Sequence, residues 1–460
     1  MPDIAFLLFF VVIYGVPVML VCCATVLAAL AAPRGRHGDV WAGYLSRGAS
    51  VAGMGLVGMG IAAWNTFEDG AYDDFGSAMT ELAAFFSASV FLLGLGPAVP
   101  WLLGVLGRGS ARLPGPLRPA ARHLADDRTR TAPAVAATMV ATAVTVALVI
   151  VAYAQTAQDR ANHEPLAQPG ALVVNFSPEQ AAAAEAAVRQ ELPGVPLARG
   201  HEVGSSGYLN VSESDDTAYI GDRALLRYLT GNPSAPHDPG TAVVVAAEPL
   251  SGHTVQLWHG LTGPDGSKVR SIQATHAEPV PGGLERVFVP MESVQGLGLR
   301  LDVVALIVDP SLHRASEADR DRIAARLGDD AGVYLEQGYR STDNWRYLAG
   351  IVALIALGGA LVATARSRRP RVLRRLGSPR LLTACRAALA AACGTVPGVV
   401  AGCVAGLLLA WPATATVGWD VVPRVPFETP WGMIGLLTVA VPALAALAGL
   451  SLGGGRTSAH

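Results

Sequence analysis

Histidines and acidic residues in the middle of the chain are the first candidates for metal chemistry. His253 and His259 would share one face of a strand, as two zinc ligands could, but no third ligand lies at a convincing spacing. Glu213, Asp215 and Asp216 form an acidic stretch, although a calcium loop needs a longer ladder of ligands closed by an acid. The sequence therefore favours two surface histidines and a solvated acidic turn, and it predicts no metal and no cofactor.

The chain is long enough to hold an enzyme, so catalytic motifs are the next candidates. The sequence contains no Gly-x-Ser-x-Gly elbow of the kind that carries a nucleophilic serine. It contains no Gly-x4-Gly-Lys-Ser/Thr loop for ATP phosphates, and its single lysine is Lys268 in the polar middle. We therefore expect no enzymatic activity, and any ATP hydrolysis that drives this chain must come from another one.

Arginine is concentrated in a few short segments. Residues 366–386 carry eight arginines, and Val372, Leu373 and Leu376 add an apolar stripe before a break at Gly377. Such charge beside an apolar run is typical of a cytoplasmic anchor that touches anionic lipid headgroups. A short helix under the membrane would also offer the apolar stripe to a partner.

A second arginine-containing segment has a helical pattern. Leu117, Ala120, Ala121 and Leu124 share one helical face, and the arginines of the segment point away from it. This pattern predicts an interfacial helix that leads into the next apolar run.

Long apolar stretches separate these segments and must position them. The 460 residues are 51% hydrophobic and only 15% charged, with a mean hydropathy of +0.39, whereas soluble domains carry about 25% charge. Seven stretches free of Asp, Glu, Lys and Arg approach or exceed the ~20 residues that cross a bilayer: 4–32, 48–64, 82–106, 132–154, 347–365, 387–411 and 429–453. We predict an α-helical polytopic membrane protein with about seven transmembrane helices and a mixed α/β extracytoplasmic domain.

The distribution of charge predicts the orientation of these helices. Four segments contain 18 arginines and three acidic residues, while the rest of the chain contains 16 basic and 33 acidic residues; the four are 33–47, 107–131, 366–386 and 454–460. Because positive segments stay in the cytoplasm, we expect a multi-pass protein of the cell membrane with its N-terminus outside, residues 156–345 outside and its C-terminus in the cytoplasm.

The long outer segment alternates between strand and helix patterns. Helices are expected over 178–192, capped by Ser177, and over 316–327, capped by Ser316. Strands are expected at 171–176, 196–203, 241–246, 254–259, 269–276, 286–290, 301–309 and 331–337. Two strand–helix–strand units near the ends predict a split α/β core with an inserted β-rich part.

The apolar stretches carry packing signals rather than chemistry. Gly398, Gly402 and Gly406 repeat every four residues on one helical face, and such small residues let membrane helices approach closely. Prolines at positions 17, 97, 100, 397 and 442 predict kinks. The threonines between 138 and 145 can bond back to their own helix, so an ion-coupled transporter is disfavoured.

Several segments resemble the FtsX-like (MacB-type) ABC transporter permease family. Residues 122–137, Arg-His-Leu-Ala-Asp-Asp-Arg-Thr-Arg-Thr-Ala-Pro-Ala-Val-Ala-Ala, are similar to the start of the first helix of such a module. Residues 331–340 resemble the end of its outer domain, and Arg-Arg-Leu-Gly-Ser-Pro-Arg at 374–380 resembles its coupling segment. The order of one helix, an outer domain and three helices matches over about 107–460, and residues 1–106 resemble the last three helices of a preceding module.

The resemblance implies the permease subunit of an ABC transporter, in which a separate cytoplasmic ATPase pushes on the coupling segment and thereby moves the outer domain. The cargo would be a lipid, lipoprotein, peptide or antibiotic. The implied coupling residues are Val372, Leu373, Arg374, Arg375, Leu376 and Gly377. Implied partners are the ATPase, the bilayer, and a second permease chain or a second copy of this one; nucleic acid is not expected. The alternative is a non-transporting membrane scaffold or signalling protein that senses or regulates a cell-envelope partner.

The predicted organisation therefore has six parts. They are a three-helix partial module (1–106), a cytoplasmic amphipathic linker (107–131), one transmembrane helix (132–155), the extracytoplasmic α/β domain (156–345), three transmembrane helices with the coupling segment 366–386 (346–453), and a cytoplasmic tail (454–460).

Overall fold

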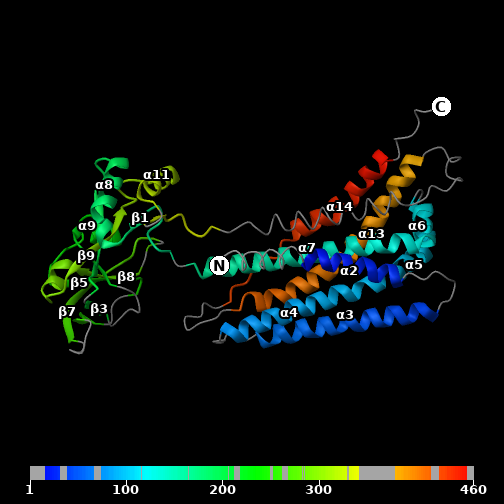
Figure 1. Cartoon of the computed structure of the whole chain (residues 1–460), viewed down its shortest axis with the longest axis horizontal. Helices are drawn as coiled ribbons and strands as arrows, with labels where there is room; N and C mark the ends of the chain where they lie inside the picture. The colour runs from blue at the N-terminus through cyan, green and yellow to red at the C-terminus, as the bar shows by residue number, and fades with distance from the viewer. Residues whose placement is uncertain are drawn as a thin grey trace. The chain divides into compact units, whose positions relative to one another are not determined.

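The chain divides into two compact units, one of helices and one built on a sheet (Figure 1). The computed structural model describes residues 16–31, 39–66, 74–114, 117–163, 165–205, 207–211, 218–248, 252–261, 268–281, 283, 285–328, 331–340, 379–415 and 424–452. The helical unit is Met1–Asn162 with Ser341–His460, and the sheet unit is His163–Arg340. The sheet unit begins later than the expected residue 156, because the preceding helix continues to Ala161.

The helical unit is made of long apolar helices. Its described helices are α2 (Val16–Ala31), α3 (Asp39–Asn65), α4 (Asp74–Leu95), α5 (Val99–Gly109), α6 (Leu117–Asp126), α7 (Arg128–Ala161), α13 (Pro379–Ala413) and α14 (Trp431–Leu452). By length and composition, five described segments could cross a membrane: Leu45–Asn65, Met79–Arg112, Arg128–Ala161, Leu381–Ala413 and Trp431–Leu450. These helices indicate a membrane-associated protein.

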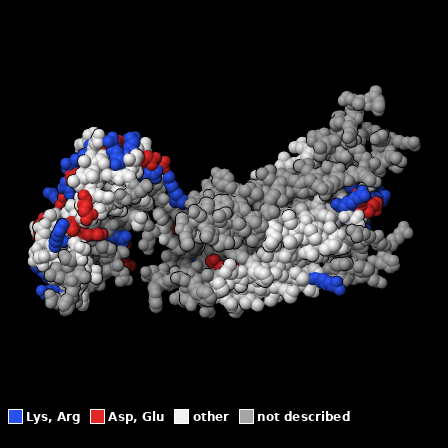
Figure 2. Space-filling model, in the orientation of Figure 1, with Lys and Arg blue, Asp and Glu red and all other residues white. Residues whose placement is uncertain are grey.

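Five of the seven predicted apolar stretches are thus confirmed as helices of membrane-spanning length. The first stretch is described from Val16 onward, where it forms α2. The fifth, 347–365, lies outside the described residues. On the face drawn in Figure 2, the described surface of the helical unit shows few charged residues, and most of these lie near one end.

Proline breaks one of these helices, as the sequence predicts. The 3-10 turn Gly96–Ala98 separates α4 from α5, and Pro97 and Pro100 stand at the starts of the turn and of α5. Proline lacks the amide hydrogen that would continue the backbone hydrogen bonds. Pro397 and Pro442, in contrast, lie inside the unbroken helices α13 and α14.

The sheet unit contains one mixed ten-stranded sheet in the order β10-β1-β9-β2-β4-β8-β5-β7-β6-β3. Its strands are β1 (Leu172–Asn175), β2 (Leu197–Val203), β3 (Gly207–Val211), β4 (Tyr219–Gly221), β5 (Thr241–Val245), β6 (Thr254–Leu261), β7 (Lys268–Ala277), β8 (Arg286–Pro290), β9 (Leu301–Val308) and β10 (Gly332–Leu335). Its helices are α8 (Ala181–Glu191), α9 (Arg223–Thr230), α10 (Met291–Gln295) and α11 (Glu317–Leu327). Sequence patterns did not predict β3, β4, α9 or α10.

Two interleaved strand–helix–strand units form one end of this sheet. β9 pairs antiparallel with both β1 and β2, so it separates the strands that α8 connects. In the same way, β1 pairs antiparallel with β10 and β9 and separates the strands that α11 connects. The chain between β2 and β9 extends the sheet beyond β2, which agrees with the predicted split core and inserted β-rich part.

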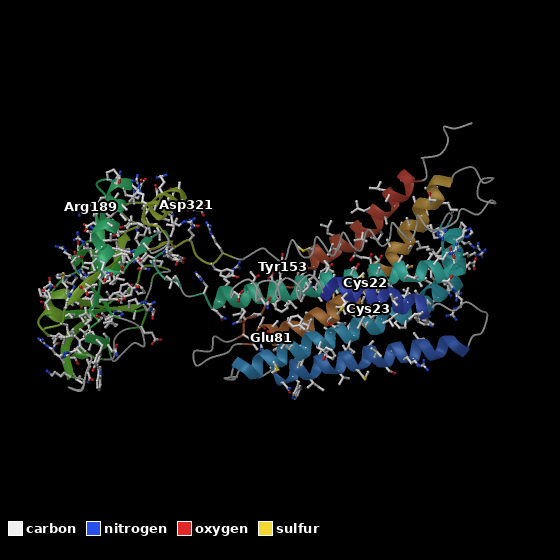
Figure 3. All side chains as sticks on the ribbon, viewed as in Figure 1. Cys22, Cys23, Glu81, Tyr153, Arg189 and Asp321 are labelled. Atoms are coloured by element: carbon white, nitrogen blue, oxygen red, sulfur yellow. The ribbon has the colours of Figure 1, made fainter. Side chains whose placement is uncertain are left out.

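The alternation of side chains along the strands gives this end of the sheet two apolar faces. Leu172, Val174 and Leu306 pack with residues of α8 and α11 on one face. Val173 and Ile307 pack with residues of α9 on the other. Figure 3 shows Arg189 on α8 and Asp321 on α11, the two helices that cover the first face.

The two predicted helix caps of the sheet unit have different outcomes. Ser316 forms a capping box: its hydroxyl accepts a hydrogen bond from the Asp319 amide, and the Asp319 carboxylate accepts one from the Ser316 amide. Ser177 makes no side-chain capping bond, because the chain first forms the 3-10 turn Pro178–Gln180 and the α-helix begins only at Ala181. The prediction was therefore right for Ser316 and wrong for Ser177.

In the Ser316→Ala variant, we expect the free energy of opening α11 to fall by about 1 kcal/mol, because the substitution removes a capping hydrogen bond. The backbone amides of α11 should then exchange with solvent about fivefold faster in hydrogen-exchange mass spectrometry of the full-length protein. Ser177→Ala is the matched control and should leave the exchange of α8 unchanged. Equal effects of the two substitutions on their own helices would contradict the assignment.

Candidate functional site

Helix α7 is the buried centre of the helical unit. Of its most apolar window, 89% is buried, whereas the corresponding share in the other four membrane-length segments is 22% to 44%. The chain leads from α6 into one end of α7 and from the other end into the sheet unit. A displacement of α7 along its axis would therefore act on both of its covalent neighbours.

The predicted packing glycines of α13 lie against α7. A Cβ atom on Gly402 would stand 2.6 Å from the Ala143 carbonyl oxygen, and one on Gly406 would stand 2.9 Å from Cβ of Ile150. At Gly398 the nearest atom would be the Met139 carbonyl oxygen, at 2.5 Å. Real Cβ atoms essentially never approach other atoms so closely, so the two backbones are near enough that only glycine fits between them.

Sequence reasoning missed one further glycine of this face. A Cβ atom on Gly394 would lie 2.8 Å from Cβ of Thr138. Its position, one turn before Gly398, continues the four-residue spacing and was a signal present in the sequence. The glycine face of α13 is therefore defined as Gly394, Gly398, Gly402 and Gly406.

The threonine hydroxyls of α7 are satisfied within the helix. Thr138, Thr142 and Thr145 each donate to the carbonyl oxygen four residues earlier, at 3.0, 2.7 and 2.8 Å. The prediction that these side chains bond back to their own helix is confirmed. Bound in this way, the hydroxyls offer close packing rather than a chain of polar groups along which an ion could pass.

The corner between α6 and α7 is tied to the beginning of α13. Asp127, between the two helices, lies 3.6 Å from the guanidinium of Arg386 on α13. Thr131 donates to the carbonyl oxygens of Leu124 and Asp127, which holds α6 at a fixed angle to α7. The predicted face of α6 is also found, because Ala120, Ala121 and Leu124 are buried and the arginines at 118 and 122 are exposed.

A second polar cluster joins the helices at the opposite end of α7. The Gln158 side chain is buried, and its carbonyl oxygen accepts a hydrogen bond from the Val425 amide at 3.1 Å. Arg424 donates to the Thr66 carbonyl oxygen at 2.7 Å and lies over the Trp411 ring, 4.7 Å from its centroid. The end of α7 is thereby bound to the ends of α3 and α13.

Several predicted site residues fall outside the described part of the chain. The coupling residues Val372 to Gly377 lie there, and α13 begins at Pro379, two residues after the last of them. The acidic stretch at 213–216 also lies outside the described residues.

The histidine prediction needs one correction. His253 is exposed, but His259 on β6 is buried, because every second residue of this strand faces the core. Burial, followed by the charges of Lys268 and Arg270, lowers the pKa of His259 below its ordinary value. Within the described ranges, no group of His, Cys, Asp and Glu could hold a metal ion.

We expect Gly402→Ala to lower the thermal stability of the full-length protein, because its methyl group would overlap the backbone of α7 at a cost of about 1–3 kcal/mol. The measurement is the midpoint of thermal aggregation in mild detergent, followed by size-exclusion chromatography. Gly435→Ala on α14 is the matched control, since a Cβ atom there has no neighbour within 4 Å, and its midpoint should be unchanged or slightly raised. A Gly402→Ala midpoint at or above that of the control would contradict the close packing.

No model of a known protein family matches this chain, and a search of curated proteins found no match. The function proposed below therefore rests on the geometry of the chain and on its own sequence.

Proposed function

We propose that this chain is the permease subunit of an ABC transporter of the FtsX-like kind. A separate cytoplasmic ATPase binds the coupling segment, and its movement passes through the helices to the sheet unit, which faces the outside of the cell. The single observation that carries this proposal is the continuous packing of α13 along α7. In the sequence, α13 begins two residues after the predicted coupling segment, and α7 ends where the sheet unit begins.

Packing of this kind supports transmission of force. A glycine face in contact with a facing backbone leaves no loose layer of side chains, so a push on α13 moves α7 with little loss. The ion pair of Arg386 with Asp127 joins the two helices at the coupling end, and Gln158 and Arg424 hold the opposite end.

Co-purification tests the proposal against the scaffold alternative. The affinity-tagged full-length chain is isolated from its own cells in mild detergent. Retention of a nucleotide-hydrolysing ABC subunit supports the permease. A sensor kinase or cell-wall hydrolase retained in its place supports the scaffold and contradicts the permease.

Replacement of Leu373 and Leu376 together by Asp is expected to abolish the ATP turnover that the chain stimulates in its partner. Two charged side chains cannot be buried in an apolar groove of the ATPase, where the proposal places the two leucines. Insertion into the membrane should be unaffected, since the substitutions lie outside the apolar stretches. Leu312→Asp, at an exposed leucine of the sheet unit, is the matched control and should leave turnover unchanged. Unchanged turnover in the purified complex of the double variant would count against the coupling segment.

Arg386→Gln and Asp127→Asn should each reduce stimulated ATP turnover about two- to fivefold, because each removes the same partly exposed ion pair. The double variant should be no worse than either single variant, which is the mark of two residues that act as a unit. Arg189→Gln, which removes an exposed pair on α8, is the control. Additive losses in the double variant would show that the two residues do not act through each other.

A further inference from the structure

Two open cavities lie side by side in the sheet unit, and the proposed coupling path does not involve either. One has a volume of about 250 Å³ and the other about 200 Å³. They share three lining residues, Asn175, Tyr219 and Ala305, so they adjoin each other and are named the two lobes of one space. Together they fall within the size range of small-molecule sites, roughly 300–1,000 Å³.

The space arises where the two halves of the sheet meet. β2 pairs with β9 from Leu197 to Val203, but with β4 only through His201 and Ile220. The register of β2 also shifts between Gly200 and His201. Gly200 has no side chain and Ala305, its partner on β9, has a small one, so the floor of the space is formed by small residues.

One lobe of the space is polar. Arg286 brings a cation to it and Glu202 a carboxylate, from the beginning of β8 and the end of β2 respectively. The guanidinium of Arg286 donates to the Glu285 carbonyl oxygen at 3.0 Å, and Nδ1 of His201 lies 3.3 Å from the Ile220 carbonyl oxygen. Among the described residues, Arg286 and Glu202 bring groups of opposite sign to this lobe, which suits a ligand that carries both charges.

The other lobe is apolar and aromatic. It is lined by Leu166, Val173 and Ile307 and by the rings of Tyr219, Tyr228 and Tyr334. Two of the tyrosine hydroxyls are engaged with the protein: that of Tyr228 accepts from the Gln168 amide at 2.8 Å, and that of Tyr334 donates to Glu336 at 2.9 Å. The rings therefore line the lobe while these hydroxyls are satisfied elsewhere.

Tyr334 in the aromatic lobe stays uncharged at physiological pH. Burial, together with the hydrogen bond to Glu336, raises the pKa of Tyr334 to about 12. Glu336 itself is buried and accepts hydrogen bonds from the amides of Leu166 and Gly338. This carboxylate holds the segment that carries Leu166 against β10, so the wall of the lobe is fixed before any ligand arrives.

We propose that this space binds a small amphipathic molecule with a zwitterionic head and an apolar body, of the class of hydrophobic dipeptides. The apolar side chains enter the aromatic lobe, the carboxylate meets Arg286 and the ammonium meets Glu202. The role of this space as the cargo site of the permease rests on the proposed function. Binding of the molecule to the space does not depend on that function.

The test uses the full-length protein in lipid nanodiscs and the dipeptide leucyl-phenylalanine, with binding followed by saturation-transfer NMR. We expect saturable binding of leucyl-phenylalanine. Glycyl-glycine, which has the same charged ends, should give none. Arg286→Gln should weaken binding about tenfold, because a charge-assisted hydrogen bond is lost. Ala305→Leu should abolish it, because the new side chain fills the floor that both lobes share.

The matched control is Ser271→Leu, which adds similar bulk at an exposed position of β7 that lines neither cavity. It should bind the dipeptide like the native protein. Each variant is first shown by size-exclusion chromatography to be as monodisperse as the native protein, and Arg286→Gln tests the site without adding bulk. Equal affinity in the native protein and in both site variants, or no saturable binding at millimolar dipeptide, would overturn the proposal.

The co-purification experiment separates failure of the site from failure of the proposed function. If the dipeptide binds as expected and no ATPase is retained, the site stands and the permease proposal fails. If an ATPase is retained and the dipeptide does not bind, the site is refuted and the permease proposal stands.

Discussion

The contact between the glycine face of α13 and the backbone of α7 is the constraint on which the helical unit depends. In a bilayer, lipid chains are as apolar as leucine, so burial of apolar surface does little to bring helices together, and close packing must supply the attraction. Glycine provides that packing here because a methyl group at Gly402 would overlap the Ala143 carbonyl oxygen. The same device recurs between α3 and α4, where a Cβ atom on Gly48 would lie 2.9 Å from the Gly94 carbonyl oxygen.

The sheet unit joins two halves in one sheet. The half with the interleaved strand–helix–strand units is covered by helices on both faces, because its strands carry apolar side chains on alternate sides. The inserted half has its own core around Val255, Leu257 and Val289. Where the two cores meet, β2 and β4 share a single residue pair. The space between the two lobes' walls at this junction is thus a consequence of the insertion rather than of any one side chain.

The sequence predicts what depends on neighbouring residues and fails where distant segments meet. Uninterrupted apolar runs and the capping box at Ser316 are local, and both are present in the structure. Helix α9 was missed although Asp222 caps its start and Gly231 follows its end, because eight residues after a three-residue strand give too short a pattern. The lining of this space could not be predicted, since Tyr219 and Ala305 come together only through strand order. The coupling residues at 372–377 lie outside the described residues, so their role stays a prediction.

The arrangement of polar groups explains why the proposed function is mechanical rather than conductive. An ion or proton path through the bundle needs side chains that exchange partners at membrane depth. The α7 threonines instead donate to their own backbone, and polar contacts between helices are found at the ends of α7, at Asp127 and Gln158. Polar contacts at both ends of α7 and α13 make this closely packed helix pair stiff along its length. An ion path between the two helices would require them to separate. In the proposed function, a push delivered at α13 would reach α7, whose end leads directly into the sheet unit. Cargo recognition by that unit would then be coupled to the push through this short connection.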